Sequence, residues 1–161
     1  MSDAQLADFS VATVWLARGE RYYLLERMRG RYDFPQLKRA VDALRQRWPG
    51  AVTLIERAGS GISLIQTLRA EGALVIGRPP DADKQTRLFT TQPLFEAGAV
   101  LFPKNAPWID ELVSELLAFP QTRHDDQVDS IAHALNYFRA QVRQRQTNIC
   151  IGLLVFLRKG I

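Results

Sequence analysis

The chain has 161 residues, a length that suits one domain, and its 47% hydrophobic and 24% charged residues exclude a disordered chain. Cys150 is the single cysteine, which excludes an internal disulfide and favours a reducing, cytoplasmic compartment. No signal peptide is visible, and no apolar run approaches the roughly 20 residues of a membrane helix. The net charge of +4 is compatible with a polyanionic partner.

The first third of the chain predicts a hairpin, a helix and a buried strand. Phe9–Ala17 and Arg21–Gly30 are rich in β-branched and aromatic residues and flank a glycine turn, which predicts an antiparallel hairpin. Apolar residues at helical spacing over 37–48, between the start signal "DFP" and the stop "PG", predict a helix. The apolar run Ala51–Glu56 predicts a buried strand that ends on an acid.

The rest of the chain alternates strands and helices. The predicted elements are, in order, a helix over 62–72, a strand over 73–77, a polar helical stretch over 81–98 interrupted near Pro93, a strand over 99–103 and a helix over 108–117. A last helix begins inside "RHDDQVDS" and places Val128 to Val142 on one apolar face. This alternation predicts an α/β sandwich around a largely parallel sheet, with antiparallel pairing from the hairpin.

The tail "TNICIGLLVFLRKGI" continues the pattern poorly, since an apolar run follows a highly polar helix end. A docking strand, or an aggregation-prone edge strand, is one interpretation. The other is foreign sequence from an altered reading frame, and this is the interpretation we favour. We therefore expect a domain over 1–146 and an atypical tail over 147–161.

Glu56 is the first candidate site residue. It stands where a buried strand runs into the glycine-containing loop "RAGSG", and ligands of α/β sheets bind outside the carboxyl ends of strands. Two structural roles compete with this reading: Glu56 could cap the next helix, or it could pair with Arg57.

The motif "RHDDQVDS" supplies the other acids, Asp125, Asp126 and Asp129. One aspartate is a favoured helix N-cap, but two adjacent acids with a third one turn on exceed what a cap requires. Like charges so close repel each other, and a divalent cation would relieve that repulsion. His124 could contact a metal or a water, whereas we expect His133 to be structural.

Several motifs together resemble the C-terminal nuclease domain of the large terminase subunit of tailed bacteriophages and prophages. They are "LIERAGSGISLIQTLR", "FEAGAVLFPKNAPWIDELVSELLAFP" and "RHDDQVDSIAHAL", with the opening hairpin and first helix in support, and they cover roughly residues 7–146. The resemblance implies a ribonuclease H-like α/β/α sandwich with a mixed central sheet. It implies an endonuclease that cuts concatemeric double-stranded DNA with two Mg²⁺ or Mn²⁺ ions.

Carried over position by position, the resemblance makes Glu56 the second acid of the family's site. Asp126, with Asp125 beside it, matches the acid on the final helix, and Asp129 and His124 are supporting residues. The family's first acid lies on a first core strand that this chain does not contain in full. We therefore expect a sheet without its middle strand and a metal site without a principal ligand.

Three basic residues are candidate DNA contacts, namely Arg57, Lys84 and Arg87. Solvated surface charge is the competing reading for all three. The resemblance further implies the portal protein, the small terminase subunit and a motor ATPase domain as partners, in the cytoplasm of a bacterial host. A catalytically inactive prophage remnant, or a DNA- or portal-binding module, is the alternative function. Another ribonuclease H-like enzyme, such as a resolvase or transposase, fits the motifs less well.

Overall fold

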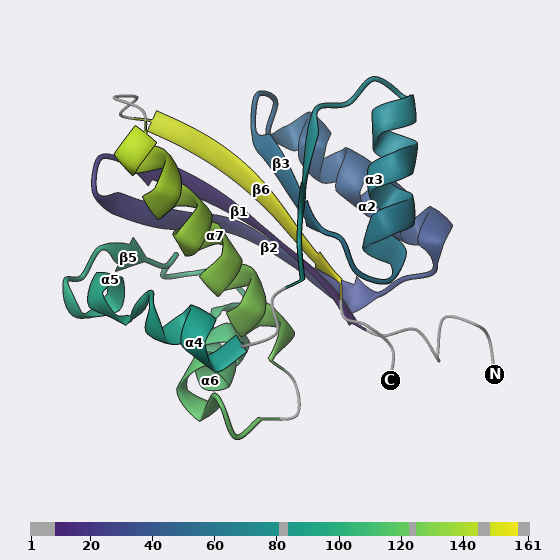
Figure 1. The fold of residues 1–161 in the computed structure, drawn as a ribbon. Coiled ribbons are helices and arrows are strands. Elements are labelled where there is room, and N and C mark those ends of the chain that lie inside the picture. Colours follow the sequence, from purple (N-terminus) through teal and green to yellow (C-terminus); the bar gives the residue numbers. More distant parts are fainter. Residues whose placement is uncertain (1–8, 81–83, 123–124, 145–148, 158–161) are drawn as a thin grey trace.

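The computed structural model describes residues 9–80, 84–122, 125–144 and 149–157, and these form an α/β/α sandwich. Figure 1 shows a twisted central sheet with α2 and α3 on one side and α4 to α7 on the other. The predicted fold class is confirmed: the sheet is mixed and helices cover both of its faces. None of the described helices is long and apolar enough to span a membrane.

One strand of the sheet runs against all the others. The strands are β1 (Phe9–Arg18), β2 (Arg21–Arg31), β3 (Val52–Glu56), β4 (Val75–Arg78), β5 (Val100–Leu101) and β6 (Ile149–Leu157), in the order β4-β3-β6-β1-β2-β5. β1 pairs antiparallel with β2 and β6, whereas β3 pairs parallel with β4 and β6, and β2 parallel with β5. The carboxyl ends of β2, β3, β4 and β6 therefore lie at the same end of the sheet.

The helices are α2 (Phe34–Arg47), α3 (Ser60–Ala70), α4 (Lys84–Phe89), α5 (Gln92–Glu96), α6 (Ile109–Ala118) and α7 (Asp126–Gln144). The polar stretch near Pro93 forms two short helices, as its interruption predicts. α2 begins at a capping box, in which the Asp33 carboxylate accepts from the Gln36 N–H at 2.8 Å and Gln36 Oε1 accepts from the Asp33 N–H at 3.0 Å.

The expected gap in the middle of the sheet is filled by the tail. β6 lies between β3 and β1, with Val155 paired to Ile55 and Leu154 paired to Thr13. A strand between two others needs apolar residues facing both layers, and the continuous run "ICIGLLVFL" has that composition. Within the described residues, therefore, the apolar part of the tail belongs to the same sheet as the rest of the chain. Its origin as foreign sequence stays a prediction.

Two hydrophobic cores hold the layers together. Ala12 and Val14 of β1 pack with Leu37, Val41 and the buried face of α3 on one side of the sheet. The other core joins the opposite face of the sheet to α6 and α7. Its fully buried residues include Trp15, Leu112, Ile131, Leu135 and Phe138. This second core fixes α7, and with it the acidic motif, against the sheet.

Candidate functional site

Glu56 ends β3 where the backbone turns sharply into α3. Gly59 has a φ of +52°, a conformation that favours glycine, and a Cβ at Gly61 would meet the Glu56 carbonyl oxygen at 2.2 Å. The two glycines thus allow α3 to begin directly against the end of the strand. The N-cap residue of α3, Gly59, makes no side-chain cap hydrogen bond, and Arg57 donates to the Gly77 carbonyl at 3.4 Å. The contact described for the Glu56 carboxylate is with His133, so the structure shows neither competing role.

The acidic motif forms the start of α7. The Asp125 carbonyl accepts from the Asp129 N–H at 2.9 Å, which is the first turn of the helix. Asp126 and Asp129 are buried, with exposures of 0% and 1%, while Asp125 is half-buried. Residues 123 and 124 lie outside the described residues, and with them His124.

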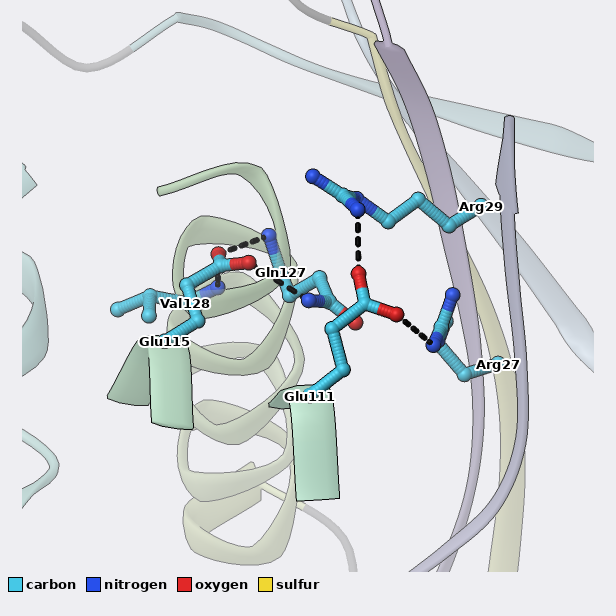
Figure 2. Close-up of polar contacts among 6 residues, drawn as sticks. All are labelled: Arg27, Arg29, Glu111, Glu115, Gln127 and Val128. Carbon is cyan, nitrogen blue, oxygen red and sulfur yellow. Dashed lines mark hydrogen bonds and ion pairs between the residues drawn. The ribbon is translucent and has the colours of Figure 1, made fainter. Parts of the chain in front are cut away.

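Glu115, on α6, caps α7 from a neighbouring element. Its Oε1 accepts from the N–H groups of Gln127 at 2.8 Å and Val128 at 3.2 Å, and its Oε2 accepts from Gln127 Nε2 at 2.6 Å (Figure 2). These two N–H groups belong to the first turn of α7. The N–H groups of a first turn find no acceptor inside their own helix. The capping of these groups, which sequence reasoning assigned to an aspartate of the motif, falls to Glu115.

Glu111 lies one turn earlier on α6 and connects α6 to β2. Its carboxylate pairs with Arg27 at 3.1 Å and with Arg29, as Figure 2 shows. The guanidinium of Arg27 also lies over the Trp108 ring, 5.5 Å from its centroid. α6 therefore connects β2 to the first turn of α7 through two carboxylates.

A chain of buried polar contacts joins Glu56 to the acidic motif. Glu56 Oε2 lies 3.3 Å from Nε2 of His133, and the same nitrogen lies 2.5 Å from Nη1 of Arg87. Arg87 Nη1 is in turn 3.9 Å from Asp129 Oδ1. Asp126, Asp129 and His133 stand at spacings of three and four residues and share one face of α7.

The structure thus brings some predicted residues together and separates others. Glu56 and Asp129 are connected through His133 and Arg87, and the sequence alone predicts only a structural role for His133. The spacing of four residues between Asp129 and His133 was the available signal. Arg87 is 7% exposed and faces the acids, not the surface expected of a DNA contact. Arg57 is exposed, and the side chain of Lys84 lies outside what the structure describes.

The described side chains do not complete a divalent-metal site. Among them, no group of three or more histidine, cysteine, aspartate or glutamate residues is placed to hold an ion. β6, the strand beside β3, contains no acid in its sequence "ICIGLLVFL". Among the residues that the structure describes, the ribonuclease H-like fold therefore brings no third carboxylate to Glu56 from the neighbouring strand.

Comparison with known proteins agrees with this fold. A search of curated proteins found no match. The family model described as "Terminase RNaseH-like domain" matches residues 2–138, which includes β1 to β5 and most of α7 but not β6. Because the match spans most of the chain, this protein belongs to the terminase RNaseH-like domain family.

Proposed function

We propose that this chain binds double-stranded DNA as the nuclease-type domain of a phage packaging terminase, and that it does not cleave DNA by itself. The observation that supports the absence of cleavage is the position of β6. A strand without any acid lies beside β3, at the place from which a third carboxylate would reach Glu56. Two-metal hydrolysis needs acids from several elements around the ions.

Positive charge near the acids supports DNA binding. Arg27, Arg29 and Arg31 alternate along β2 and therefore point to one face of the sheet, the face that α6 covers. Glu111 pairs with two of the three, and Arg31 is exposed at the end of the strand. β2 ends at the same end of the sheet as β3, three strand spacings or roughly 14 Å away.

The second candidate function is the metal-dependent endonuclease that the family resemblance implies. It is favoured by Glu56 at the carboxyl end of β3 and by the complete burial of Asp126 on α7. In that case Glu56 and Asp126, with Asp125, would hold Mg²⁺ or Mn²⁺, and the ions would activate a water and stabilise the leaving oxygen. Residues outside the described part of the chain, or residues of another protein, would have to complete the site.

The expected partners follow from the same family and belong to this proposal. They are duplex DNA, the portal protein, the small terminase subunit and a motor ATPase domain, in the cytoplasm of a bacterial host. An inactive prophage remnant would keep the DNA contact and lose only the hydrolysis.

A plasmid assay separates the two functions. Purified protein is incubated with supercoiled plasmid in MgCl₂ or MnCl₂, and a parallel sample is run for DNA retardation. We expect retardation and intact plasmid at all protein concentrations. Cation-dependent nicking that is lost in both Glu56→Ala and Asp126→Ala would establish the endonuclease instead. If the protein does not retard DNA even at low salt, the DNA-binding proposal is wrong.

A further inference from the structure

We propose that Arg69 and Arg57 close the open edge of β4 against pairing with a strand of a second copy of this chain. Among the strands that the structure describes, β4 is the last at its end of the sheet and pairs with β3. An edge strand presents backbone N–H and C=O groups with which another chain can pair, so soluble proteins protect such edges. Two guanidinium groups, one from α3 and one from the loop between β3 and α3, supply the protection here.

The alternation of the backbone along β4 identifies which of its groups face outward. The Arg78 carbonyl accepts from the Arg57 N–H at 2.7 Å, directly after β3, so the backbone groups of Arg78 face β3. Backbone groups of successive residues in a strand point to opposite sides. The groups of Ile76 therefore face β3 as well, and those of Val75 and Gly77 face the open edge.

Both outward carbonyls accept hydrogen bonds from arginine side chains. Arg69, on α3, donates to the Val75 carbonyl from Nη2 at 2.9 Å and from Nε at 3.3 Å. Arg57 donates to the Gly77 carbonyl from Nη2 at 3.4 Å. A Cβ at Gly77 would meet Arg57 Nε at 2.6 Å and Cγ at 3.2 Å, so the stem of Arg57 lies against the bare backbone of Gly77. An added strand would have to displace both guanidinium groups.

The sequence around β4 is one that pairs readily when its edge is open. The segment "ALVIG" contains no charge, and Leu74 and Ile76 are 92% and 41% exposed. Uncharged segments of high β-propensity at an open edge favour self-pairing. A second copy of β4 is the partner that the two arginines exclude, because two-fold pairing would place the same apolar residues opposite one another.

The guanidinium groups oppose self-pairing by their charge as well. In antiparallel pairing about a two-fold axis at Ile76, Val75 of one copy would stand opposite Gly77 of the other. Arg69 of one copy would then meet Arg57 of the other, since each arginine lies on the carbonyl of its own residue. Like charges a few ångströms apart repel, and salt weakens this repulsion at an exposed edge. The same two side chains thus block the edge by their bulk and by their charge.

Sedimentation equilibrium of the full chain, combined with hydrogen exchange of the β4 amides, tests the closed edge. We expect the native chain not to associate through β4. Arg57→Ala with Arg69→Ala should bind a second copy at least about tenfold more tightly than the native chain does. In the associated form, the outward N–H groups of Val75 and Gly77 should gain protection, whereas that of Ile76, which already faces β3, should not.

Arg18→Ala with Arg39→Ala is the matched control, because it removes the same charge from two exposed arginines outside β4. This control should associate no more tightly than the native chain. Adding Ile76→Lys to the double variant should restore the monomer, because a lysine on the edge strand repels its own copy. Arg69→Ala alone leaves Arg57 in place and should show a smaller gain of association.

The proposal is wrong if the double variant and Arg69→Ala both associate no more tightly than the native chain. It is also wrong if association appears without protection of the Val75 and Gly77 amides, or if the native chain already gains that protection as its concentration rises. Should the double variant not fold, Arg69→Ala alone decides by the same two readouts. Neither readout involves DNA or a metal, so the outcome is independent of the proposed function.

Discussion

At the scale of single residues, Glu115 holds the first turn of α7 in place. It is buried, and it accepts three hydrogen bonds from the first turn of α7. Charge-assisted hydrogen bonds of this kind are stronger than neutral ones, and losing the acceptor leaves backbone N–H groups buried without a partner. Asp126 lies in that same turn, so the cap determines where this acid is held.

We predict that Glu115→Ala lowers the free energy of unfolding by about 2–3 kcal/mol. Urea denaturation measures it. Glu111→Ala is the matched control, one turn earlier on the same helix, and its half-exposed carboxylate should contribute about 1 kcal/mol or less. Equal costs for the two variants would contradict the assignment of Glu115 as the cap of α7.

Glu26 provides a pH-dependent contact between β2 and the end of α2. Burial raises the pKa of its carboxyl, but hydrogen bonds from Arg47 and from Trp48 Nε1 outweigh that effect and hold the pKa below its ordinary value of 4.5. A lowered pKa in the folded state stabilises the protein above the unfolded pKa, and this stabilisation is lost as pH falls through the folded pKa.

We therefore expect the native chain to be more stable than Glu26→Gln near pH 7, and the difference to shrink as the pH falls below 4.5. Urea denaturation of both proteins across that range measures the difference. The difference in the free energy of unfolding could instead stay constant down to the lowest pH at which both proteins fold. Glu26 would then contribute by packing alone.

At the scale of elements, β6 decides whether the sheet is continuous. It pairs with β1 over nine residue pairs and with β3 over four. Without it, β3 and β4 would be cut off from the hairpin, and each half-sheet would expose an unpaired edge next to an apolar core. The tail is therefore a structural requirement of this chain, whatever its origin.

Removal of residues 147–161 should abolish cooperative folding. Circular dichroism during thermal melting, together with amide dispersion in NMR spectra, checks this. A shorter truncation after Leu157 spares β6 and should leave the melting transition in place. A truncated chain that still melts cooperatively at a similar temperature would show that β6 is dispensable.

The register of β6 also identifies where a third acid belongs. Val155 pairs with Ile55, so position 156 is the next along the strand beside Glu56, and it pairs with Val11 of β1. We predict that Phe156→Asp makes Mn²⁺ raise the melting temperature, although a charge on a strand paired on both sides lowers stability in EDTA. Phe156→Asn is the control and should show no Mn²⁺ effect. Phe156→Asp combined with Glu56→Gln is a second control and should also show no Mn²⁺ effect. An Mn²⁺ effect in either control would contradict the placement of position 156 beside Glu56.

At the scale of the whole molecule, the proposed contact with DNA depends on the charged side chains at the end of the sheet where the acids lie. Contacts with phosphates carry no sequence information and weaken as salt rises. We expect Arg31→Ala to weaken retardation equally on unrelated duplexes and to lower the slope of log affinity against log salt by about one. Arg39→Ala, on the opposite layer, should leave both unchanged. Equal effects of the two variants would mean that only net charge matters.

The sequence by itself determined the elements and located two groups of carboxylates. Hydrophobic periodicity and turn residues are local signals, so the hairpin, the helices and the acid at the end of β3 could be predicted from neighbouring residues. The acid motif at the start of α7 was visible for the same reason. An apolar run without alternation, by contrast, does not say which strands it joins, and the partners of β6 are more than 90 residues away in the sequence.

Only the tertiary structure decided what surrounds the acids. Glu115 looks like an ordinary acid of an amphipathic helix until α7 is packed against it, and Arg87 looks like a surface cation until α4 crosses α7. Hydrogen bonds and ion pairs between distant elements depend on packing, and local sequence carries no record of it. The sequence therefore located a place for carboxylates, and the fold placed a guanidinium, an imidazole and an acid-free strand beside them.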